Sequence, residues 1–448
     1  MASVTNNQVM DIFKKVYGKA NDLRPKGDIV DELFAFEEGK LVGDKYVEDF
    51  VLGDSVGLTW AGSSQDAFAI EPAVAGSVKQ TEIQPSQTVL SDVLSWGFMS
   101  RSASGDEASF FEGTKFVMKN HISSHNGLVT LAKLYGQSSE GLGTVSYAAV
   151  GTVYRGATYA SSAGSITLTK KDGTTIAFTN GVNTTSKAIL MAPGQFAAGH
   201  WVGKRGLKIE QVVASSGAVA ASGSLVGWDA RLGIIYVDFT PVVASAVGSH
   251  YIAPKGWAAG KCMVGMHKII TNTGSLFGIN AADEPLWSGN VIDLGSKKFN
   301  LKAVHEGVAD AVNAGGLDEP LDIIVSPRCF GQMASDEAAF RKYDASYKNK
   351  AENGFEAIEY YAANGVNRIH SSSKVKEGDV FGFVRGHTRC SGSQLPSFRV
   401  RGMNMDIISP LQDQAGFVVR SFSDQYVMCR QPAKQILWRN GNPDGIDY

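Results

Sequence analysis

Histidine and cysteine are the residues whose spacing in this sequence could support metal binding. His121 and His125 stand four residues apart in the segment HISSH, so both would lie on one face of a helix. Zinc sites need three or four ligands, and neither a glutamate after the first histidine nor a third ligand is evident here. His387 and Cys390 in GHTRC are similarly close and similarly lack partners. We therefore expect packed or solvated histidines and no metal site.

A reactive thiol is the next possibility. Cys329 follows Arg328 in VSPRCFG, where the sequence predicts a strand-to-helix turn, and a helix N-terminus lowers the pKa of a thiol. The alternative is that this cysteine is a small apolar residue filling a gap. The other cysteines, Cys262, Cys390 and Cys429, are far apart, and no CxxC motif occurs. Scattered free thiols are typical of an intracellular protein.

Motifs for other chemistry are absent. The nucleophile pattern GxSxG does not occur, and the nearest segment, GTVSYAA, lacks the second glycine. The 50 glycines never form a GxGxxG or a phosphate-binding GxxxxGKS loop. The acidic pairs Glu37-Glu38 and Asp336-Glu337 lie in charged segments typical of solvated surfaces. We therefore expect a non-enzyme with no catalytic, cofactor-binding or metal-binding residues and no cofactor.

Composition limits the possible partners. The chain has 448 residues, 44% of them hydrophobic and 19% charged, which allows a substantial core. A net charge of −2 argues against a direct grip on nucleic acid, but it suits a wall that encloses nucleic acid without adhering to it. The N-terminal segment lacks the apolar core of a signal peptide, and no run of eighteen apolar residues occurs. We therefore expect no membrane span and a protein made and kept in the cytoplasm.

Charge is unevenly distributed along the chain. Residues 1–66 contain 12 acidic and 7 basic side chains, whereas residues 385–439 contain eight basic and three acidic ones. One interpretation is that both are solvated regions with a chance bias. The other is complementary charge between neighbouring subunits, where the N-terminal segment of one chain crosses a sheet of another, which predicts salt-sensitive assembly.

The first half of the chain contains segments that lack a core of their own. Residues 1–66 begin with a short amphipathic stretch and continue with isolated aromatics that need a surface to pack against. Residues 67–106 read as an extended, projecting loop. Residues 107–136 predict one long helix, with a stripe of apolar side chains formed by Phe111, Met118, Ile122 and Val129.

The remainder predicts strands and then a mixed α/β region. Residues 137–260 are poor in charge and contain a clear hairpin around Asp172-Gly173. Farther along, Asn300 is placed to cap a helix that Gly315-Gly316 would end. The last three apolar segments of the chain resemble strands of one antiparallel sheet.

Taken in this order, the segments resemble the HK97-like major capsid proteins of tailed bacteriophages. The quoted stretches that carry the resemblance are GHWVGKRGLKIEQVV, NTGSLFGINAADEPLWSGN, LDIIVSPRCFGQMASD, GVNRIHSSSKVKEGDVFGF and QPAKQILWRNG. They are structural rather than catalytic motifs, and they cover most of the chain in combination. The resemblance implies an α+β fold with an N-terminal arm, an extended loop, a spine helix, and peripheral and axial domains with a β-rich insertion.

On this resemblance, the chain divides into six parts. They are an arm (1–66), an extended loop (67–106), a spine helix (107–136), peripheral-domain strands with the insertion (137–260), a mainly axial domain (261–405) and returning peripheral-domain strands (406–448).

The function that the resemblance implies is self-assembly. Copies would form hexamers and pentamers of an icosahedral shell around double-stranded DNA, which the shell would not read by sequence. Further expected partners are portal and scaffold proteins, and a cement protein is a possible additional one. The expected location is the virion capsid, assembled in the cytoplasm of a bacterial host.

Three alternatives remain open at this stage. The first is an encapsulin-like compartment, which has the same fold but encloses protein cargo. The second is an enzyme with an unrecognised site, which a pocket with shifted pKa values would support. The third is a β-rich adhesin or decoration protein, suggested by residues 137–260 alone.

Overall fold

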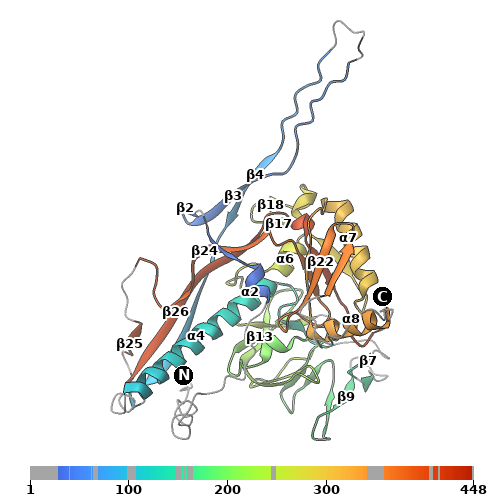
Figure 1. The fold of residues 1–448 in the computed structure, drawn as a ribbon. Helices are drawn as coiled ribbons and strands as arrows, with labels where there is room; N and C mark the ends of the chain where they lie inside the picture. Colours follow the sequence, from blue (N-terminus) through green and yellow to red (C-terminus); the bar gives the residue numbers. More distant parts are fainter. Residues whose placement is uncertain are drawn as a thin grey trace, which may run out of the picture.

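A computed structural model describes most of the chain. The described residues are 29–39, 41–61, 63, 69–97, 107–146, 153–155, 157–158, 165–243, 249–340, 358–402, 407–411 and 414–445. The amphipathic stretch near the N-terminus lies outside them, as do the side chains of residues 107–116, including Phe111. Figure 1 shows a body built of several sheets, a long helix along one side, and a narrow two-stranded projection that leaves the body.

The long helix α4 (Glu107–Tyr135) packs against a five-stranded sheet. The order of this sheet is β1-β24-β26-β25, with β5 paired to the other edge of β26. Its strands are β1 (Phe36–Glu38), β5 (Ser86–Ser95), β24 (Thr388–Ser397), β25 (Ile408–Pro410) and β26 (Gly416–Cys429). All pairings are antiparallel except that of β1 with β24. The helix predicted over 107–136 is therefore present, and it lies along this sheet.

The packed face of α4 differs from the predicted stripe. Met118 and Ile122 are only half-buried, whereas Val117, His121 and His125, at intervals of four residues, are buried. The sequence expectation failed because it counted apolar residues only. The sheet supplies polar partners for both imidazoles, so histidines can occupy the buried face.

A separate three-stranded sheet forms the base of the projection. Its strands are β2 (Leu41–Val42), β3 (Lys45–Val51) and β4 (Val78–Ile83). β3 and β4 pair antiparallel from Tyr46 with Ile83 to Val51 with Val78. The projection thus begins at β2, inside the range that we assigned to the arm, and it includes part of the predicted extended loop.

A seven-stranded antiparallel sheet forms the β-rich region. Its order is β11-β12-β15-β14-β13-β16-β6. The strands are β6 (Gly143–Thr144), β11 (Val182–Asn183), β12 (Ala188–Leu190), β13 (Lys208–Val213), β14 (Val219–Asp229), β15 (Ile234–Val237) and β16 (His250–Pro254). The predicted hairpin is confirmed as β9 (Ile166–Thr169) and β10 (Thr175–Phe178), whose alternate apolar side chains share a small core with β12 and β15.

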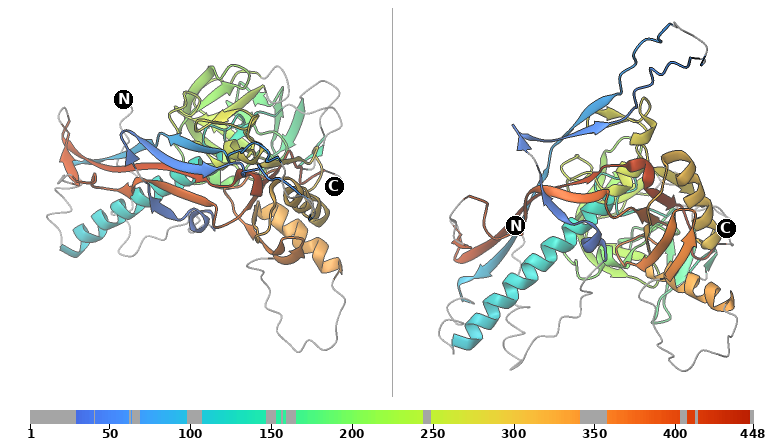
Figure 2. Two further views of the ribbon diagram at one scale, coloured as in Figure 1. Left: turned by 90° about the horizontal axis from the view of Figure 1, so that it is seen from above. Right: turned by 45° about the horizontal axis from the view of Figure 1, so that its top comes forward.

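A six-stranded mixed sheet, β19-β27-β23-β20-β22-β21, builds the other half of the body. Its strands are β19 (Asn290–Asp293), β20 (Asp322–Val325), β21 (Ile358–Ala362), β22 (Gly365–Ser371), β23 (Val380–Phe383) and β27 (Ile436–Arg439). On β20, Ile323 and Val325 enter the core under α7 (Leu301–Gly315) and α8 (Pro327–Phe340), and Ile324 enters the main core on the opposite face. In Figure 2, α8 (orange) and the seven-stranded sheet (green) lie on different sides of the body.

The last strand corrects the sequence analysis. We expected the three C-terminal segments to lie in one antiparallel sheet, and β25 and β26 do. β27, however, lies between β19 and β23 in the six-stranded sheet, parallel to the former and antiparallel to the latter. Its buried Trp438 packs against Phe299 and donates to the Ala303 carbonyl at 2.9 Å, contacts that a strand pattern alone does not reveal.

Short elements complete the described fold. They are α2 (Ile29–Leu33), β7 (Val153–Tyr154), β8 (Ala157–Thr158), α5 (Ala198–Trp201), α6 (Met266–Ile270), β17 (Ser275–Leu276), β18 (Ile279–Asn280), η1 (Pro285–Trp287) and η2 (Pro432–Lys434). Among the helices of the described residues, none has the length and apolar character needed to cross a membrane.

The predicted cap of α7 is confirmed and gives a first test. Asn300 Oδ1 accepts the Ala303 N–H at 3.1 Å, and Gly316 ends the helix with a positive φ of 62°. Replacing Asn300 with alanine should lower the free energy of unfolding by about 1 kcal/mol, because an N-terminal amide loses its partner. Asn300→Asp should retain most of the stability. Urea denaturation measures both, and equal stability of the alanine and parent proteins would contradict the assignment.

Candidate assembly interface

The projecting hairpin consists of β3, β4 and the described residues between them (52–61, 63 and 69–77). It is anchored firmly at its base. Tyr46 packs against Tyr426 with ring centroids 4.9 Å apart, and Phe50 packs against Trp287 at 5.3 Å. With Ile83 they belong to a buried cluster that joins β3 and β4 to the body. The direction of the hairpin is therefore set by side-chain packing at one end only.

Beyond this base, the hairpin exposes apolar side chains. The large apolar residues exposed on it are Val51, Val56, Leu58, Trp60, Ile70, Val74 and Val78. Trp60 is 88% exposed and Ile70 is 80% exposed. Sparse main-chain bonds tie the two sides together, such as Leu52 N to Ser77 O at 2.8 Å and Val56 N to Val74 O at 3.2 Å. Grouped exposed apolar side chains of this kind are typical of a surface that another molecule covers.

A second apolar surface lies on strand β5. One face of this strand packs on α4, and Val89 and Val93 point to the opposite face, where they are exposed. Trp96, just after the strand, is 60% exposed. Within the described residues, β5 pairs only with β26, so it is also an edge strand with unused main-chain groups. The hairpin and β5 are the two surfaces of the body best suited to contact another chain.

The two histidines of α4 join the helix to this sheet. His125 lies between two hydroxyls, with Nδ1 2.7 Å from Ser421 Oγ and Nε2 2.9 Å from Thr88 Oγ1. His121 Nε2 lies 3.1 Å from the Leu90 carbonyl. Burial lowers the pKa of His125 to about 4, with a smaller contribution from the nearby His121. Both side chains are thus packing residues that a hydrogen-bond network satisfies.

The remaining candidates from the sequence are not brought together. His387 Nε2 lies 2.7 Å from Glu319 Oε1, whereas Cys390 Sγ donates to Gln425 Oε1 in the interior. Cys329 is buried, so the gap-filling interpretation fits it better than a reactive thiol. No disulfide joins any of the four cysteines, and burial raises the pKa of the Cys262 and Cys429 thiols to about 12.

The acidic and basic regions of the sequence form ion pairs with each other within one chain. Arg389 of β24 pairs with Glu37 of β1 at 2.8 Å and with Glu48 of β3. Arg401 pairs with Glu38 at 3.0 Å. The acidic pair Glu37-Glu38, expected on a solvated surface, is more than half exposed and takes part in these ion pairs. The expected attraction between neighbouring subunits is, for these residues, an attraction between the arm and the sheet of the same chain.

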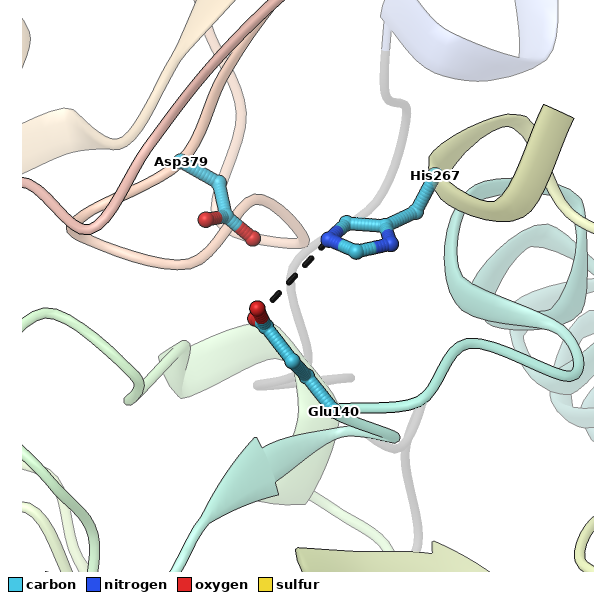
Figure 3. A group of neighbouring side chains, drawn as sticks. All are labelled: Glu140, His267 and Asp379. Atoms are coloured by element: carbon cyan, nitrogen blue, oxygen red, sulfur yellow. Dashed lines mark ion pairs between the residues drawn. The ribbon is translucent and has the colours of Figure 1, made fainter. Parts of the chain in front are cut away.

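The sequence analysis missed a buried ionic group, shown in Figure 3. Glu140, His267 and Asp379 converge from the loop after α4, from α6 and from the loop before β23. Lys376, whose side chain is fully buried, completes the group, with Nζ 3.4 Å from Glu140 Oε2 and 3.8 Å from Asp379 Oδ2. These residues are far apart in sequence and form no motif. The one available signal was a cluster of charged residues in VKEGD, between two apolar strands.

A metal ion fits this group poorly. Glu140, His267 and Asp379 each offer one ligand atom, and those atoms lie within 4.8 Å of one another. However, the cations of Lys376 and Arg439 already balance the two carboxylates there, and a divalent ion would add uncompensated positive charge to the interior. Burial disfavours ionised Glu140, but the attraction of Lys376 and His267 is stronger and lowers its pKa to about 2. The group is best described as an internal ion pair.

Comparisons with known proteins indicate which fold the chain has. No protein-family model and no curated protein sequence matches this chain. A chain of the cyanophage A-1(L) capsid asymmetric unit matches it with a TM-score of 0.50 and 8% identity, over 95% of this chain and 97% of that chain. A chain of the mature capsid of bacteriophage PhiM1 matches with a TM-score of 0.41 and 10% identity, over 95% and 90%. The SrpI encapsulin of Synechococcus elongatus PCC 7942 matches 38% of this chain and 61% of that chain, with a TM-score of 0.24 and 9% identity.

The cyanophage match extends over nearly the whole of both chains. The predicted fold class is therefore confirmed: the chain has an α+β, HK97-like capsid fold. The similarity lies in the arrangement of the elements and is accompanied by almost no sequence identity.

The arginine pairs give a matched test. Arg389→Met should lower the free energy of unfolding by about 2 kcal/mol, because it leaves partly buried Glu48 with only the more distant Arg430, 3.9 Å away, as a cation. Arg401→Met should cost less than about 1 kcal/mol, since that pair is exposed to water. Urea denaturation of both variants at low and high salt measures the difference. Equal losses would show that burial does not govern these pairs.

The buried histidine predicts acid sensitivity. Because the pKa of His125 is about 4 in the folded chain and near 6.5 when unfolded, the unfolded chain binds the proton first. Its contribution to stability is therefore complete above pH ~6.5 and declines, by about 3 kcal/mol at most, as the pH falls towards 4. His125→Asn does not titrate and should show a shallower loss over that range. An unchanged acid dependence in urea titrations would refute this role, and the range above neutral pH is the internal control.

Proposed function

We propose that the chain is the major capsid protein of a tailed bacteriophage, a structural subunit rather than an enzyme. Copies of the chain assemble into hexamers and pentamers of an icosahedral shell that encloses double-stranded DNA. The capsid fold supports this proposal, and the surface chemistry of the projecting hairpin makes it specific.

One observation carries the proposal: a hairpin with seven exposed large apolar side chains extends from an otherwise well-packed body. Burying one such side chain contributes about 1.5–3 kcal/mol, so leaving them all in water is costly. A second copy of the same chain offers a suitable partner surface in the exposed face of β5, with Val89, Val93 and Trp96. We infer that the hairpin of one subunit lies across this face of its neighbour.

The parts of the fold take roles consistent with the capsid architecture. We assign the six-stranded sheet with α7 and α8 to the axial domain, and the five-stranded sheet with α4 to the peripheral domain. The projecting hairpin is the extended loop, and the seven-stranded sheet is the insertion. β27 then joins the axial sheet, although the range 406–448 was expected to hold returning peripheral strands.

The near-neutral chain suits a container wall. With a net charge of −2, the subunit has no overall basic excess with which to hold DNA by its phosphates. Portal and scaffold proteins are further proposed partners, and a cement protein is a possible additional one. The proposed location is the virion capsid, after assembly in the cytoplasm of a bacterial host.

An encapsulin-like compartment is the main alternative within the same fold. Both predict closed shells, so particle formation alone does not separate them. Particles purified from infected cells should contain double-stranded DNA that nuclease cannot reach. Particles that contain a packaged protein and no DNA would favour the compartment.

The hairpin gives the decisive variant. Trp60→Ser together with Ile70→Ser should leave the folded subunit intact but weaken assembly by more than tenfold, since each lost contact is worth over about 1.4 kcal/mol. Val219→Ser, on an exposed strand of the insertion, is the matched control and should assemble normally. Sedimentation and electron microscopy of the three proteins measure the assembled fraction. Undiminished shells from the double variant would refute the proposed contact.

A further inference from the structure

One short segment fastens the six-stranded sheet to the rest of the body. Residues 372–379 connect β22 to β23 and cross to α4, α5 and the loop that precedes α5. The bonds that the segment makes there are Gly199 N to Ser373 O at 2.9 Å, Lys376 N to Tyr135 Oη at 3.0 Å, Glu377 N to Phe196 O at 3.0 Å and Gly378 N to Gly194 O at 2.6 Å. The segment is therefore a polar junction between the two halves of the body, beside the apolar core that Ile324, Phe381 and Phe383 share with α4.

Two buried charges lie within the segment. Lys376 is 0% exposed, and its ammonium lies 2.9 Å from Gln195 Oε1 and 4.6 Å from the centre of the Tyr135 ring. Asp379 is also 0% exposed, and no described residue donates a well-formed hydrogen bond to its carboxyl oxygens. An ionised carboxylate in that position would be stabilised mainly by Coulomb attraction, with a smaller contribution from the Tyr135 hydroxyl.

Charged and titratable groups from every neighbouring element face Asp379. Tyr135 belongs to α4, Glu140 to the loop after it, His267 to α6 and Arg439 to β27. When both carboxyls are ionised, the two cations, Lys376 and Arg439, balance them. The balance changes by one full charge when Asp379 gains or loses a proton.

We propose that Lys376, Glu140 and Asp379 form a proton-operated latch between the two halves of the body. With the Asp379 carboxyl protonated, the segment 372–379 stays closed against α4 and the insertion. When that carboxyl releases its proton to solvent, the buried charge favours an arrangement in which the segment moves out and Asp379 reaches water. No covalent bond changes, and the proton is the only species exchanged.

The difference between the pKa of Asp379 in the closed and in the open arrangement decides whether opening increases or decreases with pH. Burial raises the pKa of Asp379 to about 7, because the attraction of Lys376 offsets only part of the desolvation and Glu140 adds a like charge. In an open arrangement the carboxyl would titrate near its ordinary value of about 3.9. The closed form therefore binds the proton more tightly, and opening becomes up to about tenfold more favourable for each pH unit between about 4 and about 7, with no further gain at higher pH once both forms are ionised.

Hydrogen exchange of the full-length chain tests the latch. Amides of residues 194–199 and 372–379 should exchange faster as the pH rises from about 4 to about 7, after correction for intrinsic chemistry, and should show no further increase above that range. Asp379→Asn removes the titrating group and should abolish this extra pH dependence. Asp322→Asn, at another carboxylate of the six-stranded sheet, is the matched control and should retain it. A parent-like pH dependence in Asp379→Asn would overturn the proposal.

Two further variants decide the matter even if Asp379→Asn does not fold. Lys376→Met removes the cation that favours ionised Asp379, so the pH at which opening stops increasing should move upward. Glu140→Gln removes a like charge, so that pH should move downward. Shifts in these opposite directions would support the latch. Shifts in one direction, or none, would contradict it.

Discussion

The exposed apolar surface of the projecting hairpin is the constraint on which this account depends. Its base is held by the packing of Tyr46 and Phe50, so the hairpin extends from the body in a defined direction. Its distal side chains, Trp60 above all, meet nothing in the described part of their own chain that buries them. The free energy that is lost by exposing these side chains to water is recovered when another molecule covers them, and a second copy is the partner that is always available.

The body is built to carry that projection. The sheet that receives the hairpin base is joined to α4 through His121 and His125, and it is joined to the arm through Arg389. On the other side, the segment around Lys376 connects α4 to the six-stranded sheet. The hairpin base, α4 and the six-stranded sheet are thus joined in turn by packed aromatic rings, by imidazole hydrogen bonds and by a buried polar junction beside a shared apolar core.

Sequence reasoning predicted the parts of the fold that local pattern determines. The hairpin at Asp172-Gly173, the cap at Asn300 and the long helix α4 follow from residue type and spacing. It missed what depends on distant partners. The buried face of α4 was predicted wrongly because only apolar residues were counted towards it. Only the structure shows that Ser421 and Thr88 provide hydrogen-bonding partners for the buried His125 ring. Lys376 and Asp379 could not be paired with Glu140, since more than two hundred residues separate them. Charge bias suggested an attraction between residues 1–66 and 385–439, but it did not single out Arg389 and Glu37 and could not tell one chain from two.

The most direct measurement of the central claim is an electron cryomicroscopy map of the particles that the full-length chain forms. The account predicts a closed shell in which Trp60 and Ile70 of one subunit are buried against strand β5 of the next. A folded, stable monomer at high concentration, with the hairpin turned back on its own body, would contradict it.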